Sequence, residues 1–223
     1  MKIITLIGSP HGLKGNTAKL TQIVLEGAES EGATSEIISL TGKNILPCKG
    51  CDMCHKKGIC PQDDEFESIK KKIIEADCLI LASPNYIFSV SAQMKAFMDR
   101  CCGVLHCLGF EGKYGASIVT SGGGDEEPIA DYMNHFLIIT GVRPVGSVWA
   151  AMGNIGEIFP DEIRTNALNL GKKLVLSCKN KITCEETETR INKFKDRMRY
   201  LMQWKKQEWT FEYEYWKKHH NLE

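Results

Sequence analysis

The sequence predicts an α/β fold, in which a doubly wound, five-stranded parallel sheet is followed by a C-terminal helical extension. Short apolar runs alternate with stretches of helical periodicity through residues 1–180, which is the pattern of strand–helix units. One of these runs, residues 78–82, is continuously apolar, as expected for a central parallel strand that is buried on both faces. Residues 181–223 instead combine charged and aromatic residues. We therefore expect a main domain over 1–180 and an extension over 181–223.

The expected elements follow one another along the chain. Apolar runs predict five strands, at 3–7, 35–40, 78–82, 116–120 and 142–151. Helical spacing of apolar residues predicts helices up to about residue 30 and at about 65–74, 90–101, 128–139, 160–177 and 185–218. Asp64 is expected to cap the second helix together with Glu67. The last helix either packs on its own domain or covers a neighbouring subunit.

The non-helical stretches after the first, third and fourth strands are predicted to meet. They span residues 9–17, 84–89 and 121–125. In a doubly wound sheet, ligands bind outside the carboxyl ends of the strands. We therefore expect these three loops to form one pocket at one edge of the sheet.

Charge and hydropathy exclude several classes of protein. Lys plus Arg and Asp plus Glu each number 28, so the formal net charge is zero, which argues against broad nucleic-acid binding and against a polybasic membrane surface. No apolar run approaches the ~20 residues of a membrane-spanning helix. The N-terminus enters a strand without the pattern of an export signal, and we expect a cytoplasmic protein. Ten cysteines then favour metal binding, redox chemistry or buried thiols over disulfides.

The loop between the first strand and the first helix, residues 8–17, has the features of a phosphate site. A loop entering a helix offers unpaired N–H groups and the positive end of the helix dipole. Ser9, Asn16 and Thr17 add hydrogen-bond donors. The loop lacks the Gly-Lys-Ser/Thr ending of nucleoside-triphosphate-binding loops. It also lacks the G-x-G-x-x-G fingerprint of dinucleotide-binding domains. A single terminal phosphate would suit this loop; the alternative is a glycine-rich turn without a ligand.

Residues 44–63 form a cysteine-rich loop. It carries four cysteines in the pattern C-x2-C-x2-C-x5-C: Cys48, Cys51, Cys54 and Cys60. This compact run favours a [4Fe–4S] cluster, because structural zinc sites usually pair two knuckles across a longer spacer. Zinc, a redox-active thiol pair, and free cysteines that serve only the loop's structure remain open alternatives. The other six cysteines show no ligand spacing.

Several segments of the chain resemble the NADPH-dependent FMN reductase family, which has a flavodoxin-like fold. They are Gly8-Ser9-Pro10, Gly15-Asn16-Thr17, Ser83-Pro84-x-Tyr86 and the block from Ser91 to Arg100. The compact cysteine run resembles the iron–sulfur flavoprotein branch of that family. The resemblance covers about residues 1–150 and leaves the aromatic tail outside it.

This resemblance implies FMN and a set of residues that bind it. The phosphate would lie on the first loop, the isoalloxazine along the second, and backbone N–H groups of the third would face its polar edge. The implied residues are Ser9, Pro10, His11, Asn16 and Thr17; Pro84, Asn85, Tyr86, Ile87 and Phe88; and Ser121, Gly122, Gly123 and Gly124. At position 11 the family more often has a basic residue than His. Tyr86 and Phe88 have an alternative interpretation, as hydrophobes that anchor their loop.

The resemblance also implies a function. FMN exchanges two electrons or one, whereas a [4Fe–4S] cluster passes one electron at a time. Together they would transfer electrons between one-electron and two-electron redox partners. No catalytic acid or base is required. NAD(P)H or ferredoxin would donate electrons to a small-molecule or protein acceptor. A homodimer or homotetramer is implied, in which the cluster of one subunit serves a neighbour's flavin. The alternatives are a cluster-free NAD(P)H-dependent FMN or quinone-type reductase and a zinc-stapled interaction module without enzymatic activity.

Overall fold

Five parallel strands form one sheet in the computed structural model, which describes residues 1–42, 45–154 and 159–222. In the spatial order β2-β1-β3-β4-β5, the strands span Thr34–Ser39, Lys2–Ile7, Cys78–Pro84, Tyr114–Ser121 and Arg143–Ala151. This order confirms the predicted doubly wound sheet, whose direction of winding reverses between β1 and β3. Asn44, where the predicted cysteine loop begins, and Glu223, the last residue of the extension, lie outside the described residues.

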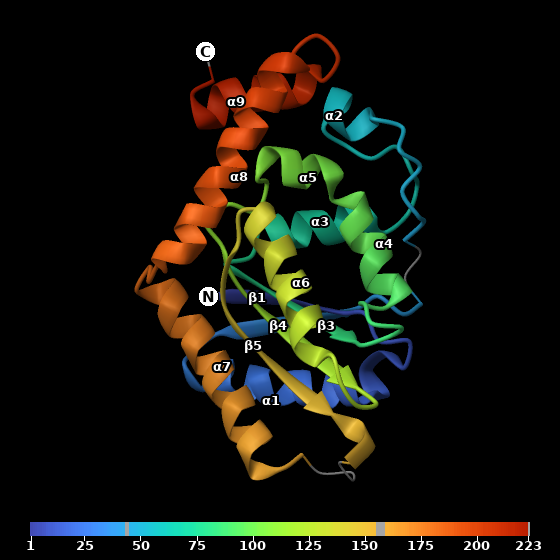
Figure 1. The fold of residues 1–223 in the computed structure, drawn as a ribbon, viewed down its shortest axis with the longest axis vertical. Coiled ribbons are helices and arrows are strands. Elements are labelled where there is room, and N and C mark those ends of the chain that lie inside the picture. Colours follow the sequence, from blue (N-terminus) through green and yellow to red (C-terminus); the bar gives the residue numbers. More distant parts are fainter. Residues whose placement is uncertain (43–44, 155–158, 223) are drawn as a thin grey trace.

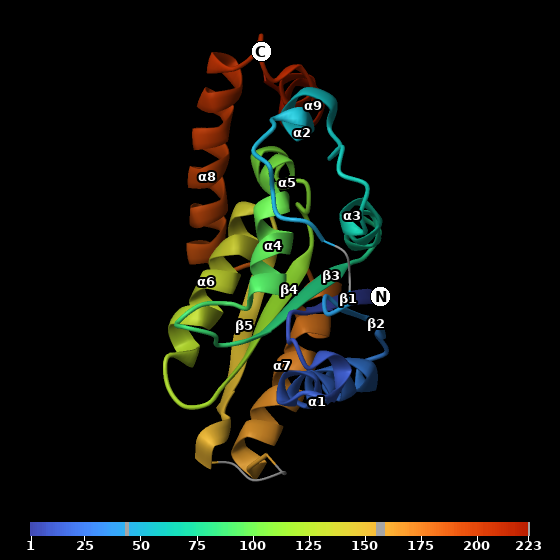
Figure 2. The same cartoon turned by 90° about the vertical axis from the view of Figure 1, so that its right-hand side faces the viewer.

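Helices cover both faces of this sheet (Figures 1 and 2). One face is covered by α1 (Asn16–Ser30) and α7 (Asp161–Lys179). The other face is covered by α3 (Phe66–Ile74), α4 (Ala92–Arg100) and α6 (Glu126–Ile139). The remaining helices are η1 (Gly12–Lys14), α2 (Met53–Lys57), α5 (Cys102–Cys107), η2 (Met152–Asn154), α8 (Glu185–Trp204) and α9 (Thr210–His220). None of the helices in the described ranges has the length and hydropathy that crossing a membrane requires.

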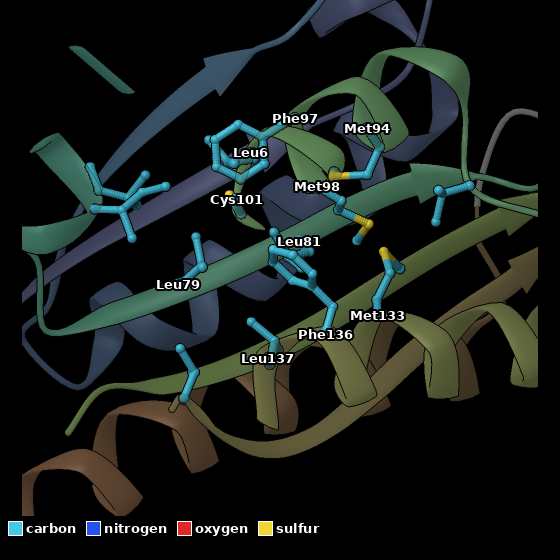
Figure 3. Close-up of a cluster of buried hydrophobic side chains, with 14 of the residues drawn as sticks. Leu6, Leu79, Leu81, Met94, Phe97, Met98, Cys101, Met133, Phe136 and Leu137 are labelled. Carbon is cyan, nitrogen blue, oxygen red and sulfur yellow. The ribbon is translucent and has the colours of Figure 1, made fainter. Parts of the chain in front are cut away.

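Strand β3 shows why a continuous apolar run predicts a central strand. Its side chains alternate between the faces, so Leu79 and Leu81 contribute to one core, while Ile80 contributes to the other. Figure 3 shows the first core, where the two leucines gather with Phe97 of α4 and Phe136 of α6. Burial of each such side chain stabilises the fold by roughly 1.5–3 kcal/mol.

Two glycines set the close packing of α1 on α7. A Cβ built on Gly27 would lie 2.1 Å from the carbonyl oxygen of Leu168, and one on Gly171 would lie 1.9 Å from that of Val24. Any larger residue at either position would force the helices apart. Gly27 lies within the helix predicted up to about residue 30, but its role follows only from the packing.

Several helix boundaries differ from the predicted ones. Helix α3 begins at Phe66, and Asp64 still accepts the N–H of Phe66 at 3.0 Å. The expected reciprocal cap is wrong, because the carboxylate of Glu67 accepts the N–H of Cys60 at 2.9 Å instead. The helix expected over 90–101 is shorter, and α5 follows it as a separate helix.

The predicted single helix over 185–218 is wrong. The extension contains two helices, α8 and α9, which are separated at residues 205–209. Helix α9 folds back and packs against α5 and α2 of the same chain (Figures 1 and 2). A third apolar cluster holds it there, in which Trp216 of α9 and Met202 of α8 are fully buried with Leu108. Of the two alternatives for the tail, the structure of the chain thus shows packing on its own domain.

Candidate functional site

The loops that follow β1, β3 and β4 meet at the carboxyl edge of the sheet, as its topology predicts. They line a cavity of about 180 Å³. Nine of the fourteen residues predicted to bind FMN line it: Ser9, His11, Asn16, Thr17, Pro84, Asn85, Tyr86, Ser121 and Gly122. Five do not: Pro10, Ile87, Phe88, Gly123 and Gly124. Thr120 and Met152 line the cavity and were not predicted.

The first loop is a tight turn that leads into the N-terminus of α1. Ser9 and Thr17 are buried, and the hydroxyls of Thr17 and Thr120 are 2.7 Å apart. The N–H of Gly12 donates to the carbonyl of Ser9 at 2.9 Å. Helix α1 begins after Gly15, and no described side chain caps it. The first amides of α1, which have no acceptor within the helix, are therefore free to bind an anion.

The first and second loops are joined through Ser91 at the N-terminus of α4. Its hydroxyl donates to the carbonyl of Gly8 at 2.5 Å and accepts the N–H of Met94 at 3.2 Å. A Cβ built on Gly8 would lie 2.8 Å from both the Ser91 hydroxyl and the Met94 Cβ. Only glycine permits this approach, so Gly8 fixes the spacing between the two loops.

The second loop contains a two-residue hairpin turn. Tyr86 and Ser89 exchange backbone hydrogen bonds of 2.9 and 3.2 Å. The two residues between them have left-handed backbones, with φ of +50° at Ile87 and +59° at Phe88. This conformation is costly for β-branched and aromatic residues. Their side chains are 91% and 78% exposed, so Phe88 does not anchor the loop in the core that the structure describes.

The third loop leaves polar groups and open space at the cavity. Asn85 donates its side-chain N–H to the carbonyl of Gly124 at 3.1 Å, while its Oδ1 is buried and has no partner among the described residues. No described atom lies within 4 Å of a Cβ built on Gly122 or Gly123. A planar ligand with a polar edge would occupy this space and satisfy the amide of Asn85.

Glu126, which the sequence did not single out, holds the third loop. Its carboxylate accepts the hydroxyl of Ser121 and, at 2.9 Å, the N–H of Gly124. Burial raises the pKa of Glu126, but the hydrogen bonds from Ser121 and from backbone N–H groups outweigh that effect and hold the pKa below its usual value. The ionised carboxylate thus orders the glycine run beside the cavity.

The cysteine loop carries its four predicted ligands as free thiols. Cys48 and Cys51 are exposed, whereas Cys54 and Cys60 are half-buried. Helix α2 lies inside the loop between Cys51 and Cys60. Among the described residues, none of these sulfurs belongs to a group of three possible ligand atoms within 4.8 Å of one another. A single zinc ion would need its sulfurs roughly 4 Å apart, whereas the ligands of a cluster bind different irons and lie further apart.

A buried ion pair closes the two ends of the cysteine loop. Arg100 donates to both carboxylate oxygens of Asp64, at 2.6 and 3.2 Å, and to the carbonyl of Leu46 at 2.9 Å. Asp64 also accepts the N–H of Leu46 at 3.0 Å. Burial raises the pKa of Asp64, but the hydrogen bonds from Arg100 and the backbone outweigh it and lower the pKa. The loop is therefore tied to α4.

Arg100 also faces the interior of the cysteine loop. Its Nε is buried and has no hydrogen-bond partner among the described residues. Arg100 and Lys70 line a cavity of about 220 Å³ together with Cys54. Lys70 pairs with Glu67, which lines the same cavity, so the Nε–H of Arg100 is the group here that suits a thiolate ligand.

One group of possible metal ligands in the described chain was not predicted. It consists of His55 of α2 with Cys102 and His106 of α5, each of which offers an atom within 4.8 Å of the others. Burial lowers the pKa of His55, but its hydrogen bonds with Cys102, Cys54 and the carboxylate of Glu212 outweigh that effect and raise the pKa. The i,i+4 spacing of Cys102 and His106 was a signal in the sequence, because it places both side chains on one helix face.

The amino-acid sequence matches the NADPH-dependent FMN reductase family over residues 1–157. It is 37% identical to an iron–sulfur flavoprotein of Archaeoglobus fulgidus over 189 residues, which cover 84% of this chain and 85% of that protein. It is 40% identical to an iron–sulfur flavoprotein of Methanocaldococcus jannaschii over 185 residues, which cover 78% of this chain and 95% of that protein.

The fold is similar to that of flavodoxins. The structure of a flavodoxin from the domain Archaea superposes with a TM-score of 0.53, at 17% sequence identity, over 80% of this chain and 99% of that one. At this identity the likeness concerns the fold alone. It agrees with the strand order of the sheet, and the fold is flavodoxin-like as predicted.

Proposed function

The chain belongs to the NADPH-dependent FMN reductase family, and from this premise we propose that it is an iron–sulfur flavoprotein that moves electrons between FMN and a [4Fe–4S] cluster. As a member of that family it is a flavin-dependent oxidoreductase. One observation carries the proposal: the compact run of four free cysteines and the three-loop cavity occur on one chain. We assign FMN binding to a domain over residues 1–180 and treat residues 181–223 as an extension.

The cavity fits FMN in both the polarity and the shape of its lining. Ser9, Asn16 and Thr17, with the first amides of α1, would hold the phosphate, and His11 would lie beside it. The free Oδ1 of Asn85 and the open glycine run Gly122–Gly124 would face the polar edge of the ring. Tyr86 lies at the cavity. Ile87 and Phe88, at the tip of the hairpin, supply exposed apolar surface that would cover the isoalloxazine ring.

The cysteine loop fits an iron–sulfur cluster. Cys48, Cys51, Cys54 and Cys60 would supply one thiolate to each iron. The bound groups supply the chemistry: FMN exchanges two electrons or one, and the cluster exchanges one. The chain itself binds and orients them, and no side chain is assigned as an acid or base. Arg100, whose charge is paired with Asp64, would donate its remaining Nε–H to a thiolate.

The arrangement of the two sites supports transfer between subunits. Figure 1 shows α2, which lies inside the cysteine loop, near one end of the molecule, away from the carboxyl ends of β3 and β5. In a homodimer or homotetramer, the cluster of one subunit would then serve the flavin of its neighbour. We assign NAD(P)H or ferredoxin as the electron donor, a small molecule or protein as the acceptor, and the cytoplasm as the location.

An absorption spectrum with iron and acid-labile sulfide assays tests the proposal, on protein purified without oxygen. About four irons and four sulfides per chain, beside a flavin spectrum, are expected. A flavin spectrum without iron would show a NAD(P)H-dependent reductase in which the cysteine loop is structural. A colourless protein with bound zinc would show that the chain is an interaction module instead.

A further inference from the structure

The C-terminal extension contacts the cysteine loop through side chains at the start of α9. The hydroxyl of Thr210 donates to the carbonyl of Lys56 in α2 at 3.3 Å. Next to it, the ring of Phe211 lies over Gly58, so closely that a Cβ on Gly58 would be 2.4 Å from the ring. Gly58 ends α2 with φ of +76°, which favours glycine. Helix α9 therefore covers the last turn of the only helix described inside the cysteine loop.

One carboxylate joins this loop to the rest of the domain. Glu212 is fully buried. Its Oε1 accepts the Nδ1–H of His55 at 2.6 Å, and its Oε2 accepts the Nδ1–H of His106 at 3.0 Å. His55 belongs to α2 and His106 to α5, so a single side chain links three helices. Buried charged hydrogen bonds of this kind are strong, and they are costly to break.

Aromatic stacking completes the link. The indole ring of Trp209 stacks on His55 at 4.4 Å and on His106 at 5.0 Å between ring centroids. The two imidazoles stack on each other at 4.7 Å. These contacts fix the plane of each ring as well as its hydrogen bond, so that rotation of either histidine is opposed.

Helix α9 is itself held firmly on α5. Trp216 is fully buried, and its Nε1–H donates to the carbonyl of His106 at 2.9 Å. The Nε2 of His220 is 3.1 Å from the carbonyl of Cys107. The C-terminal half of α9 therefore has an anchorage on α5 that is separate from its contacts with the cysteine loop, so that α9 can impose a position on the loop.

The stacked geometry argues against a metal ion shared by the two histidines. Their ring planes differ by only 23°, and their centroids are 4.7 Å apart. The lone pair of a ring nitrogen lies in the ring plane, and two stacked, nearly parallel planes do not meet at a point where one ion could lie about 2 Å from a nitrogen of each ring. Both Nδ1 atoms are already bonded to Glu212. The group of His55, Cys102 and His106 is therefore better explained by a structural link than by a metal site.

We propose that α9 is a clamp that positions the cysteine loop for its metal centre, and that Glu212 is the positioning residue of this clamp. The proposal deepens the proposed function and rests on it for the identity of the centre. It implies that the loop is ordered by the protein before any iron binds. It also gives the aromatic tail a role within a single chain.

Hydrogen exchange of iron-free protein tests the clamp without reference to activity. In E212Q, amides of residues 52–60 should exchange about tenfold faster or more than in the parent chain, because one buried charged acceptor is lost. E214Q is the matched control, since Glu214 lies two residues away on α9 but is exposed and pairs with Lys217. After reconstitution with iron and sulfide, E212Q should also lose its cluster to a chelator about tenfold faster, while FMN content is unchanged.

Unchanged exchange of residues 52–60 in a folded E212Q protein would overturn the proposal. If E212Q does not fold, H106Q takes its place, because it removes only one of the two bonds and should raise exchange to a smaller extent. If the parent protein binds no iron after reconstitution, the proposed function is overturned. The exchange result would still test whether α9 positions the cysteine loop. One equivalent of metal that survives C48S/C51S and is lost in H106Q would show a metal site at the histidines and overturn the clamp.

Discussion

The three-loop cavity and the cysteine loop are held in place in different ways. The cavity is formed by the ends of adjacent strands, whose register brings the loops after β1, β3 and β4 together. The cysteine loop is fixed by side chains from distant parts of the chain. Asp64 pairs with Arg100 across 36 residues, and His55 pairs with Glu212 across 157. A site on strand ends is thus positioned by the sheet, whereas a site on a long loop needs anchors of its own.

This difference implies that the two sites can be disturbed separately. Changes at the cysteine loop or its anchors should leave FMN bound, because no anchor contributes to the cavity. Changes at the glycine run should weaken FMN binding without releasing the loop. Cys51→Ser tests that independence directly, and the other variants test how each region is held.

The largest effect is expected from Cys51→Ser. Loss of one of four thiolates should abolish the cluster, and with it the cluster absorbance at ~400 nm, while FMN remains bound. Iron and sulfide assays beside the flavin spectrum measure both outcomes. Unchanged iron and sulfide content would remove Cys51 from the ligand set, and joint loss of FMN would show that the two sites are not independent.

The next largest effect is expected from Arg100→Met. Both side chains of the pair are buried, at 1% exposure for Arg100 and 0% for Asp64. Removing the cation leaves a buried, unpaired carboxylate, which costs about 3–5 kcal/mol of unfolding free energy. Denaturant unfolding measures this loss. Lys95→Met is the matched control on the same helix, since its pair with Asp99 is exposed, and a similar loss there would contradict the argument.

Gly122→Ala should weaken FMN binding by about tenfold, because the added methyl group enters the space assigned to the ring. In the structure this methyl group meets no described atom within 4 Å. The melting temperature of the FMN-free protein should therefore not change. Fluorescence titration with FMN gives the affinity. An unchanged affinity would place the flavin elsewhere than beside Gly122.

The smallest effect is a pH dependence of the extension. Burial lowers the pKa of His220, and its bond to the Cys107 carbonyl only partly opposes this. The unfolded state then binds the proton more readily. The contribution of His220 to the free energy of unfolding is therefore complete above the ordinary histidine pKa of about 6.5, and it is lost as the pH falls below that value. Tryptophan fluorescence during unfolding at pH 7.5 and 5.5 should show a smaller difference in His220→Gln, and an equal difference would contradict this assignment.

Most of the fold and much of the lining of the three-loop cavity could be predicted because their signals are local. The apolar run of β3 and the loop at Ser9–Thr17 reflect burial and turn geometry within a few residues. The positions of Ile87 and Phe88 could not be predicted in this way. Their left-handed turn follows from the hairpin between Tyr86 and Ser89, and nothing in their side chains favours it.

The sequence by itself determined the order of strands and helices, the meeting of three loops at one edge of the sheet, and the spacing of the four cysteines. Only the tertiary structure decided that the tail divides at residues 205–209 and returns to the cysteine loop. Periodicity and capping act over a few residues, so they leave a pattern that can be read. The division of the tail instead accompanies the burial of Trp216 and Glu212 against α2 and α5, and a contact across more than 100 residues leaves no such pattern.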